Sequence, residues 1–178
     1  MTEPLPQAIL VDLDDTIIAL TDSIALCWES LCAQFAPRCE HVTAEELLAA
    51  IEASNAWFWS DPERHRLGRL RLEEALIEIV TRALASLGLD DPALAREVAE
   101  AFTPELRSRV CPFPGAIETL QSLREQGVRL ALISNGSAAG QRAKVDHFGL
   151  EPLFDCIVIE GEFGLGKPDA RVFWHVLD

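Results

Sequence analysis

A short apolar run near the amino terminus leads directly into a cluster of carboxylates. Residues 8–11 are apolar and partly β-branched, which indicates a strand covered on both faces. Asp12, Asp14 and Asp15 follow at once. Side chains two positions apart on an extended segment point the same way, so Asp12 and Asp14 are expected to share one face of the strand tip. Like charges this close repel unless a divalent cation or a shared proton lies between them, which favours a functional site over a polar turn.

The order of the remaining patterns predicts an α/β fold. Residues 23–110 have helical periodicity throughout and contain no strand pattern of comparable strength. Helices and strands then alternate over 115–126 (helix), 128–133 (strand), 137–148 (helix) and 156–159 (strand). A strand, a helical insert and this alternation predict a parallel sheet with right-handed crossovers.

We therefore predict a Rossmann-like parallel-sheet core with an all-helical cap subdomain inserted after the first strand. The core comprises residues 1–16 and 111–178, and the cap comprises residues 17–110. A last helix is expected over residues 170–177.

Capping residues and breakers divide the insert into helices. Ser23 begins a helix that Pro37 ends, and Thr43 with Glu46 fits a capping box. One long amphipathic helix is expected over residues 64–87, after an Asp-Pro start and before a glycine stop. A further helix begins after the next Asp-Pro pair and runs towards Phe102, with a kink or restart at Thr103-Pro104.

Composition excludes several classes of partner. The net charge of −14 argues against nucleic acid or an anionic membrane surface. No apolar run approaches the roughly 18 residues that a membrane span needs. The cysteines are odd in number and include no Cys-x-x-Cys pair, which indicates reduced thiols rather than a disulfide framework or a zinc knuckle. We expect a soluble, cytoplasmic protein.

Two further polar segments follow the second and third predicted strands. Ser134, Asn135 and Gly136 offer a hydroxyl and free backbone N–H groups to an anion, although an Asn-Gly turn before an ordinary N-cap is the alternative. Lys167, one of only two lysines, lies in a glycine-rich loop before a proline. A solvated lysine and a phosphate counter-ion are both consistent with that position.

Together the three segments resemble the haloacid dehalogenase superfamily, in its phosphatase-like branch with a helical type-one cap. The run Asp12-Leu13-Asp14-Asp15-Thr16 is similar to the first motif of the family, Ser134 to the second and Lys167 to the third. The helical insert lies where the family places this cap. The resemblance covers the chain from end to end.

The resemblance implies a role for each motif residue. Asp12 would be the nucleophile that forms an aspartyl phosphate, and Asp14 the general acid and base. Ser134 and Lys167 would bind phosphoryl oxygens. Mg²⁺ would be held by the Asp12 carboxylate and the Asp14 backbone carbonyl. Dehalogenases of the family resemble an Asp-x-Tyr-Gly-Thr pattern that lacks the second acid, so Asp14 favours phosphate esters.

Substrate contacts are expected from the core and from the cap. In the core they are Leu13, Asn135 and Gly136. In the cap, Trp57 lies in a Trp-Phe-Trp run followed by several cations, among them Arg66 and Arg69. The alternative is that the tryptophans fill the small core of the cap, while the arginines form ion pairs on a solvated helix face.

The fourth motif of the family, a Gly-Asp with a further acid that completes the metal site, has no counterpart after Lys167. The core is therefore expected to be truncated at its carboxyl end, with weak metal binding and little turnover. The predicted function is a magnesium-dependent phosphatase for a small phosphorylated metabolite. Alternatives are a non-enzymatic phospho-acceptor or binding module, a phosphomutase or a dehalogenase, and a homodimer or strand-edge association is possible.

Overall fold

The structure is a computed structural model that describes residues 5–177. The chain divides into two compact units, which we call the core unit, residues 1–20 with 111–178, and the cap unit, residues 21–110. Each unit is described by itself.

The division after residue 20 lies four residues later than the boundary predicted at Thr16. Ile17 and Ile18 are 2% and 0% exposed. Ile18 forms a bridge with Pro112, and the Ala19 N–H donates to the Cys111 carbonyl over 2.9 Å. The outgoing and returning segments therefore pair with one another inside the core unit, which periodicity alone could not reveal.

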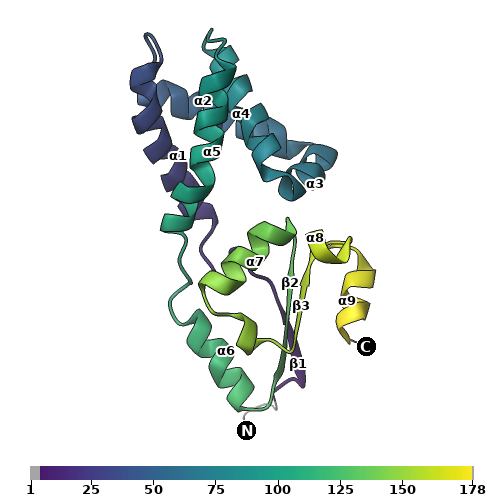
Figure 1. Cartoon of the computed structure of the whole chain (residues 1–178). Helices are drawn as coiled ribbons and strands as arrows, with labels where there is room; N and C mark the ends of the chain where they lie inside the picture. The colour runs from purple at the N-terminus through teal and green to yellow at the C-terminus, as the bar shows by residue number, and fades with distance from the viewer. Residues whose placement is uncertain (1–4, 178) are drawn as a thin grey trace. The chain divides into compact units, whose positions relative to one another are not determined.

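A parallel sheet organises the core unit. Its strands are β1 (Ala8–Val11), β2 (Arg129–Ser134) and β3 (Cys156–Ile159), in the order β1-β2-β3. Val11 pairs with Leu132, and Ser134 pairs with Ile159. The carboxyl ends of the strands therefore meet at one edge of the sheet, as Figure 1 shows. The α/β fold class is confirmed.

Four α-helices are assigned to the described part of the core unit: α6 (Ala116–Glu125), α7 (Ala138–His147), α8 (Glu160–Phe163) and α9 (Ala170–Leu177). α9 packs on the sheet through Val172, which is 0% exposed and clusters with Ile133 and Val158. The short α8, directly after β3, was not predicted because a single turn has no periodicity to detect.

The cap unit contains α1 (Thr21–Phe35), α2 (Ala44–Ser60), α3 (Pro62–Leu70), α4 (Leu72–Ser86) and α5 (Pro92–Arg109). Apolar faces of α1, α2, α4 and α5 form one cluster, with Ile51, Val80 and Ala95 each 0% exposed. The capping box at Thr43 is confirmed, since its Oγ1 accepts from the Glu46 N–H and the Glu46 carboxylate accepts from the Thr43 N–H.

Two details of the cap helices differ from the prediction. The long helix expected over 64–87 is two helices, broken at Arg71. The break lets α3 pack closely on α2, where a Cβ added to Gly68 would lie 2.6 Å from Phe58 Cε1. Of the kink or restart expected at Pro104, the restart does not occur: α5 continues through the proline to Arg109, and Leu106 beyond it packs against the cap cluster.

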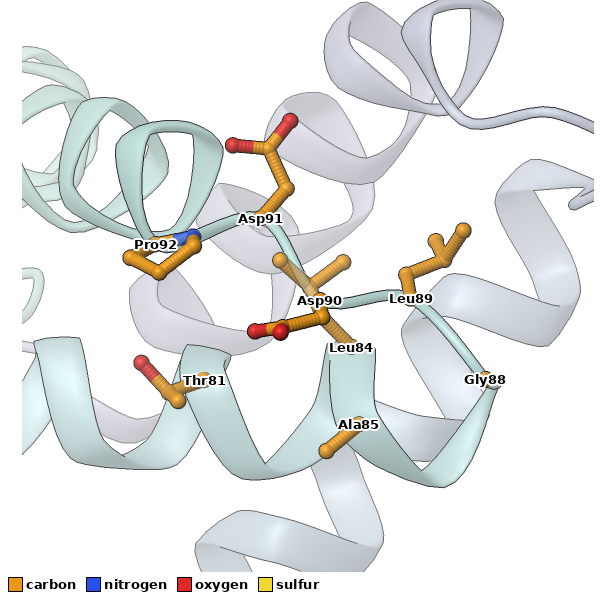
Figure 2. Close-up of a pocket in the computed structure, with 8 residues that line it drawn as sticks. All are labelled: Thr81, Leu84, Ala85, Gly88, Leu89, Asp90, Asp91 and Pro92. Atoms are coloured by element: carbon orange, nitrogen blue, oxygen red, sulfur yellow. The ribbon is translucent and has the colours of Figure 1, made fainter.

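A shallow hollow lies at the turn between α4 and α5 (Figure 2). Leu84, Leu89 and Pro92 contribute apolar atoms, and Asp90 and Asp91 contribute carboxylates. The Asp91 carboxylate accepts from the Leu94 N–H over 2.9 Å, so it caps α5. Within residues 5–177, none of the helices is both long and apolar enough for a membrane span.

Candidate active site

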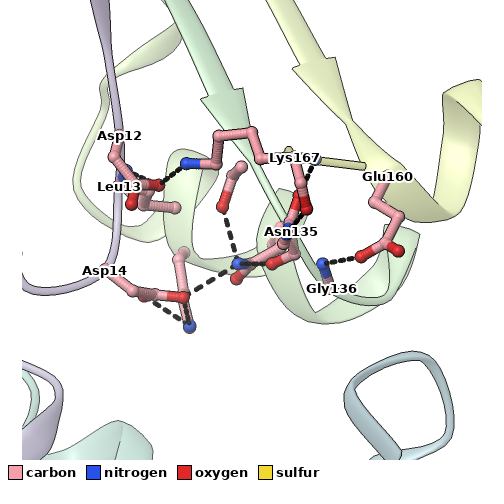
Figure 3. A network of polar contacts seen from close by, with 10 residues as sticks. Asp12, Leu13, Asp14, Asn135, Gly136, Glu160 and Lys167 are labelled. Atoms are coloured by element: carbon pink, nitrogen blue, oxygen red, sulfur yellow. Dashed lines mark hydrogen bonds and ion pairs between the residues drawn. The ribbon is translucent and has the colours of Figure 1, made fainter. Parts of the chain in front are cut away.

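Asp12 and Lys167 meet beyond the carboxyl ends of β1 and β3. The Lys167 Nζ lies 2.6 Å from Asp12 Oδ1, and the same oxygen accepts from the Leu13 N–H over 2.8 Å (Figure 3). The Asp12 side chain is 43% exposed and the Lys167 side chain 24%. The carboxylate is therefore oriented by two donors and still reachable from solvent.

Asp14 is held by residues of α7. Lys144 Nζ lies 2.7 Å from Asp14 Oδ1 and 2.9 Å from Oδ2. Gln141 Nε2 also donates to Oδ2, over 2.9 Å. The Asp14 side chain is 23% exposed, so this ion pair is better shielded from solvent than the Asp12 pair.

Ser134, at the end of β2, is joined to the same network. It is 1% exposed, and its Oγ accepts from Gln141 Nε2 over 2.7 Å. The Gln141 side chain is itself buried and also donates to the Asn135 carbonyl over 2.6 Å. One amide group thus links the second polar segment to Asp14.

The Asn135 side chain fixes the loop that carries Lys167. Its Nδ2 donates to the Lys167 carbonyl over 2.8 Å, and its Oδ1 accepts from the Lys167 N–H over 2.7 Å (Figure 3). Buried Glu160 accepts from the Gly136 N–H over 3.1 Å. A Cβ on Gly166 would lie 2.6 Å from Glu160 Cδ, so only glycine fits where this loop passes.

The structure thus brings together Asp12, Asp14, Ser134 and Lys167. The substrate contacts predicted for Leu13, Asn135 and Gly136 stay predictions. The N–H groups of Leu13 and Gly136 already donate to carboxylates, and the Asn135 amide is engaged by Lys167.

Asp15, the third acid of the opening cluster, has a turn role. Its φ is +56°, and its Oδ1 accepts from the Leu20 N–H over 2.9 Å. The polar-turn interpretation therefore describes Asp15, whereas Asp12 and Asp14 face the network at the strand tips.

Sequence reasoning missed Gln141, Lys144 and Glu160. Gln141 and Lys144 are three residues apart on α7 and so lie on one face of it, directly after the Ser134 segment. The available signal was that Lys144 is the second of only two lysines.

The residues present fit part of a magnesium site. Mg²⁺ usually keeps several waters and is held by one or two carboxylates with substrate phosphate oxygens. The Asp12 carboxylate is 43% exposed and is the kind of ligand that such a set needs, and Mg²⁺ binding by it and by the Asp14 backbone carbonyl stays a prediction. Within residues 5–177, no group of three or more His, Cys, Asp or Glu side chains is placed to hold a metal ion.

The aromatic run of the cap unit lies at the end of α2 and is largely packed. Phe58 is buried, with Trp57 and Trp59 partly buried beside it. The guanidinium carbons of Arg64 and Arg82 lie 4.0 and 4.2 Å from the Trp57 ring centroid. These contacts agree with the packing interpretation of the tryptophans.

The two cap arginines predicted to bind substrate lie on α3. Arg66 is exposed. Arg69 is partly exposed, and its Nη1 lies 3.2 Å from His65 Nδ1. Substrate binding by Trp57, Arg66 and Arg69 stays a prediction.

The buried cysteines offer no nucleophile. Burial raises the pKa of the Cys27 and Cys32 thiols to about 12. A thiol in this state is almost entirely protonated at neutral pH and unreactive.

Comparison with known proteins gives a family for this site. A family model for haloacid dehalogenase-like hydrolases matches residues 6–178. Phosphoserine phosphatase from Thermus thermophilus is 40% identical over 115 residues, which are 65% of this chain and 41% of that protein. Glyceraldehyde 3-phosphate phosphatase from Methanopyrus kandleri is 28% identical over 175 residues, 94% of this chain and 67% of that protein. The pyrimidine 5'-nucleotidase YjjG from Escherichia coli is 28% identical, and the chain spans 56% of it.

Solved structures share the fold. The hydrolase YfnB from Bacillus subtilis, solved bound to magnesium, has a TM-score of 0.68 and 22% identity, with 96% of this chain and 70% of that one covered. L-2-haloacid dehalogenase from Xanthobacter autotrophicus has a TM-score of 0.57 and 21% identity, with 97% and 64% covered. The chain spans about half the length of the first two curated relatives, at 41% and 56%. Because the family model covers nearly all of it, the chain belongs to the haloacid dehalogenase-like hydrolases.

Proposed function

We propose that this chain carries the site of a phosphatase that hydrolyses phosphate monoesters through an aspartyl phosphate on Asp12. The observation that carries the proposal is the network at the strand tips. It holds Asp12 against Lys167 at 2.6 Å and brings Asp14 and Ser134 to the same amide of Gln141. Relatives with phosphatase names support the reaction class.

In the first step a carboxylate oxygen of Asp12 bonds to phosphorus while the ester P–O bond breaks. The electron pair of that bond goes to the alcohol oxygen, which takes a proton from the Asp14 carboxyl group. In the second step Asp14 takes a proton from water, whose oxygen bonds to phosphorus as the bond to Asp12 breaks. The products are the alcohol and phosphate, and the enzyme is regenerated.

The other residues of the network stabilise charge on the phosphoryl oxygens. The Lys167 ammonium and the Ser134 hydroxyl are donors placed beside Asp12 and Asp14 before substrate arrives. When bound by the Asp12 carboxylate and the Asp14 carbonyl, Mg²⁺ would lower the repulsion between a negative nucleophile and a negative phosphate.

The substrate in this proposal is a small phosphorylated metabolite. The names of the relatives specify phosphoserine and glyceraldehyde 3-phosphate as substrates of those proteins. Within the cap unit, Trp57, Arg66 and Arg69 are the side chains we propose for substrate recognition. All five cysteines are free thiols, which supports a reducing compartment such as the cytoplasm.

Hydrolysis of p-nitrophenyl phosphate with Mg²⁺ tests the proposal. We expect low but measurable turnover by the 178-residue chain and a loss on the order of 10³-fold or more in Asp12→Asn, because the nucleophile is removed. Asp15→Asn is the matched control, since it removes a neighbouring charge and keeps an oxygen for the Leu20 N–H. Equal turnover in Asp12→Asn, or none in the unsubstituted chain, would contradict the proposal.

A further inference from the structure

Helix α7 supplies a second set of polar side chains to the site. Gln141 and Lys144 lie one turn apart on α7, and both contact Asp14, which lies 127 and 130 positions away in the sequence. None of the motif residues discussed above comes from this helix. Through these contacts α7, the helix that connects β2 to β3, touches the tip of β1.

Both lysines of this chain lie in the candidate active site. Of the 15 Lys and Arg residues, only Lys144 and Lys167 are lysines. Each pairs with one aspartate of the Asp12-Leu13-Asp14 run, Lys167 with Asp12 and Lys144 with Asp14. An ammonium group is a compact point charge with three donors, so it can bond both oxygens of one carboxylate from a single atom. Lys144 does so at 2.7 and 2.9 Å.

The contact with Gln141 shows that the Ser134 hydroxyl accepts from this amide and does not donate to it. An amide nitrogen donates and cannot accept, so Ser134 Oγ is the acceptor in its contact with Gln141 Nε2. The hydroxyl hydrogen of Ser134 is then available to another acceptor. The reversed amide would aim its oxygen at the Asp14 carboxylate and the Asn135 carbonyl, which would repel it.

The Gln141 amide also faces more acceptor oxygens than it has hydrogens to donate. Two N–H bonds face three oxygens within 2.9 Å, on Asp14, Ser134 and Asn135. The amide therefore shares its hydrogens among these groups, and the position of Asp14 depends on Lys144 as well.

From these contacts we infer that Gln141 and Lys144 are positioning residues. Lys144 holds the Asp14 carboxylate in the orientation needed for proton transfer, and Gln141 aligns Asp14 with a Ser134 hydroxyl directed at the phosphoryl group. This inference rests on the proposed phosphatase function. Neither residue touches the reacting atoms.

The inference separates substrates by their leaving group. Alkyl alcohols are poor leaving groups that need a proton from Asp14, whereas p-nitrophenolate leaves without one. We expect Lys144→Met to lower kcat/KM for an alkyl phosphate by roughly tenfold to a hundredfold, and for p-nitrophenyl phosphate by less than about threefold, within the range that general acid catalysis supplies. A merely structural role would lower both equally.

Two variants accompany that measurement. Arg142→Met removes a cation from the same helix whose guanidinium pairs with Glu162 at 2.7 Å, and it should leave both substrates unchanged. Lys144→Arg restores the charge and should recover part of the loss for the alkyl phosphate. Equal losses for the two substrates in Lys144→Met, or the same selective loss in Arg142→Met, would overturn the inference.

A second measurement needs no turnover, so it separates failure of the inference from failure of the proposed function. Lysine-selective ¹⁵N labelling gives two side-chain signals, since the chain has two lysines. We expect Asp14→Asn to shift the Lys144 signal and not that of Lys167, and Asp12→Asn to do the reverse. A Lys144 signal that does not shift in Asp14→Asn would overturn the inference even in a chain without phosphatase activity. A shift with no turnover by the unsubstituted chain would uphold the contact and contradict the phosphatase.

Discussion

The core unit and the cap unit use polar side chains for different purposes. In the core unit they join segments far apart in the sequence, as in Asp14 with Lys144 and Asp12 with Lys167. In the cap unit many act within a few residues, as where Asp61 accepts from the N–H groups that begin α3. Arg38 with Glu97 is a long-range exception on the surface. In the cap unit polar groups therefore mainly cap the ends of helices, whereas in the core unit they assemble a site.

The largest expected effect on stability comes from creating a cavity in the core of the cap unit. Ile51 is 0% exposed, so Ile51→Ala should lower the free energy of unfolding by about 2–5 kcal/mol through lost burial and a cavity. Urea denaturation followed by circular dichroism measures this. At urea concentrations below the unfolding transition, the side-chain ¹⁵N signals of Lys144 and Lys167 should keep their chemical shifts, because the network at the strand tips lies within the core unit. A loss under about 1 kcal/mol would contradict the packing described for the cap.

A matched pair of glycines sharpens the comparison. A Cβ on Gly68, in the cap, would lie 2.6 Å from Phe58 Cε1, and one on Gly161, in the core, 2.4 Å from the backbone nitrogen of Ala138. Each Gly→Ala change should cost about 1–3 kcal/mol of stability by overpacking. Gly161→Ala should also lower kcat/KM for an alkyl phosphate by roughly tenfold to a hundredfold, since it displaces the first turn of the helix that carries Gln141 and Lys144.

For the glycine pair the readouts are thermal unfolding and hydrolysis of an alkyl phosphate by the folded fraction. Gly68→Ala should leave kcat within about threefold of the parent, because the hydrolytic groups lie in the core unit. Any loss through the proposed recognition residues Arg66 and Arg69 on α3 should be in KM. A larger loss of kcat in Gly68→Ala than in Gly161→Ala would reverse the assignment of the two units.

The smallest effect is a pH dependence in the core unit. The Leu130 N–H, which donates to Asp155 over 2.8 Å, and the nearby Arg124 lower the pKa of this carboxyl group. Because the pKa is lower in the folded state, the stabilisation is present above the unfolded value of about 3.9 and is lost as pH falls through the folded value. Asp155→Asn should flatten the fall in stability below about pH 4, measured by urea denaturation across that range. An unchanged slope would show that another carboxylate controls it.

Local signals in the sequence were enough for the elements that local chemistry determines. The strands over 8–11 and 156–159 and the capping box at Thr43 agree with the structure because apolar runs and helix caps act over a few residues. The break at Arg71 could not be predicted, since it depends on the approach of α3 to Phe58.

The candidate site was predictable in part for the same reason. Asp12 follows β1, Ser134 ends β2 and Lys167 lies in the loop after β3 and α8, so the topology places them at one edge of the sheet. The partners Gln141 and Lys144 look like ordinary helical residues. Only the packing of α7 beside the tip of β1 gives them their contacts with Asp14.

Phosphorylation of Asp12 tests the central claim most directly. The Asp14→Asn variant is incubated with acetyl phosphate and Mg²⁺, quenched in acid and digested. Mass spectrometry then gives the mass and the fragment ions of the peptide that contains residues 8–16. Acetate leaves without a proton from Asp14, while hydrolysis of the intermediate needs Asp14 as a base, so we predict one phosphoryl group that accumulates on Asp12. A peptide without a phosphoryl group, or with one on another residue, would contradict the account.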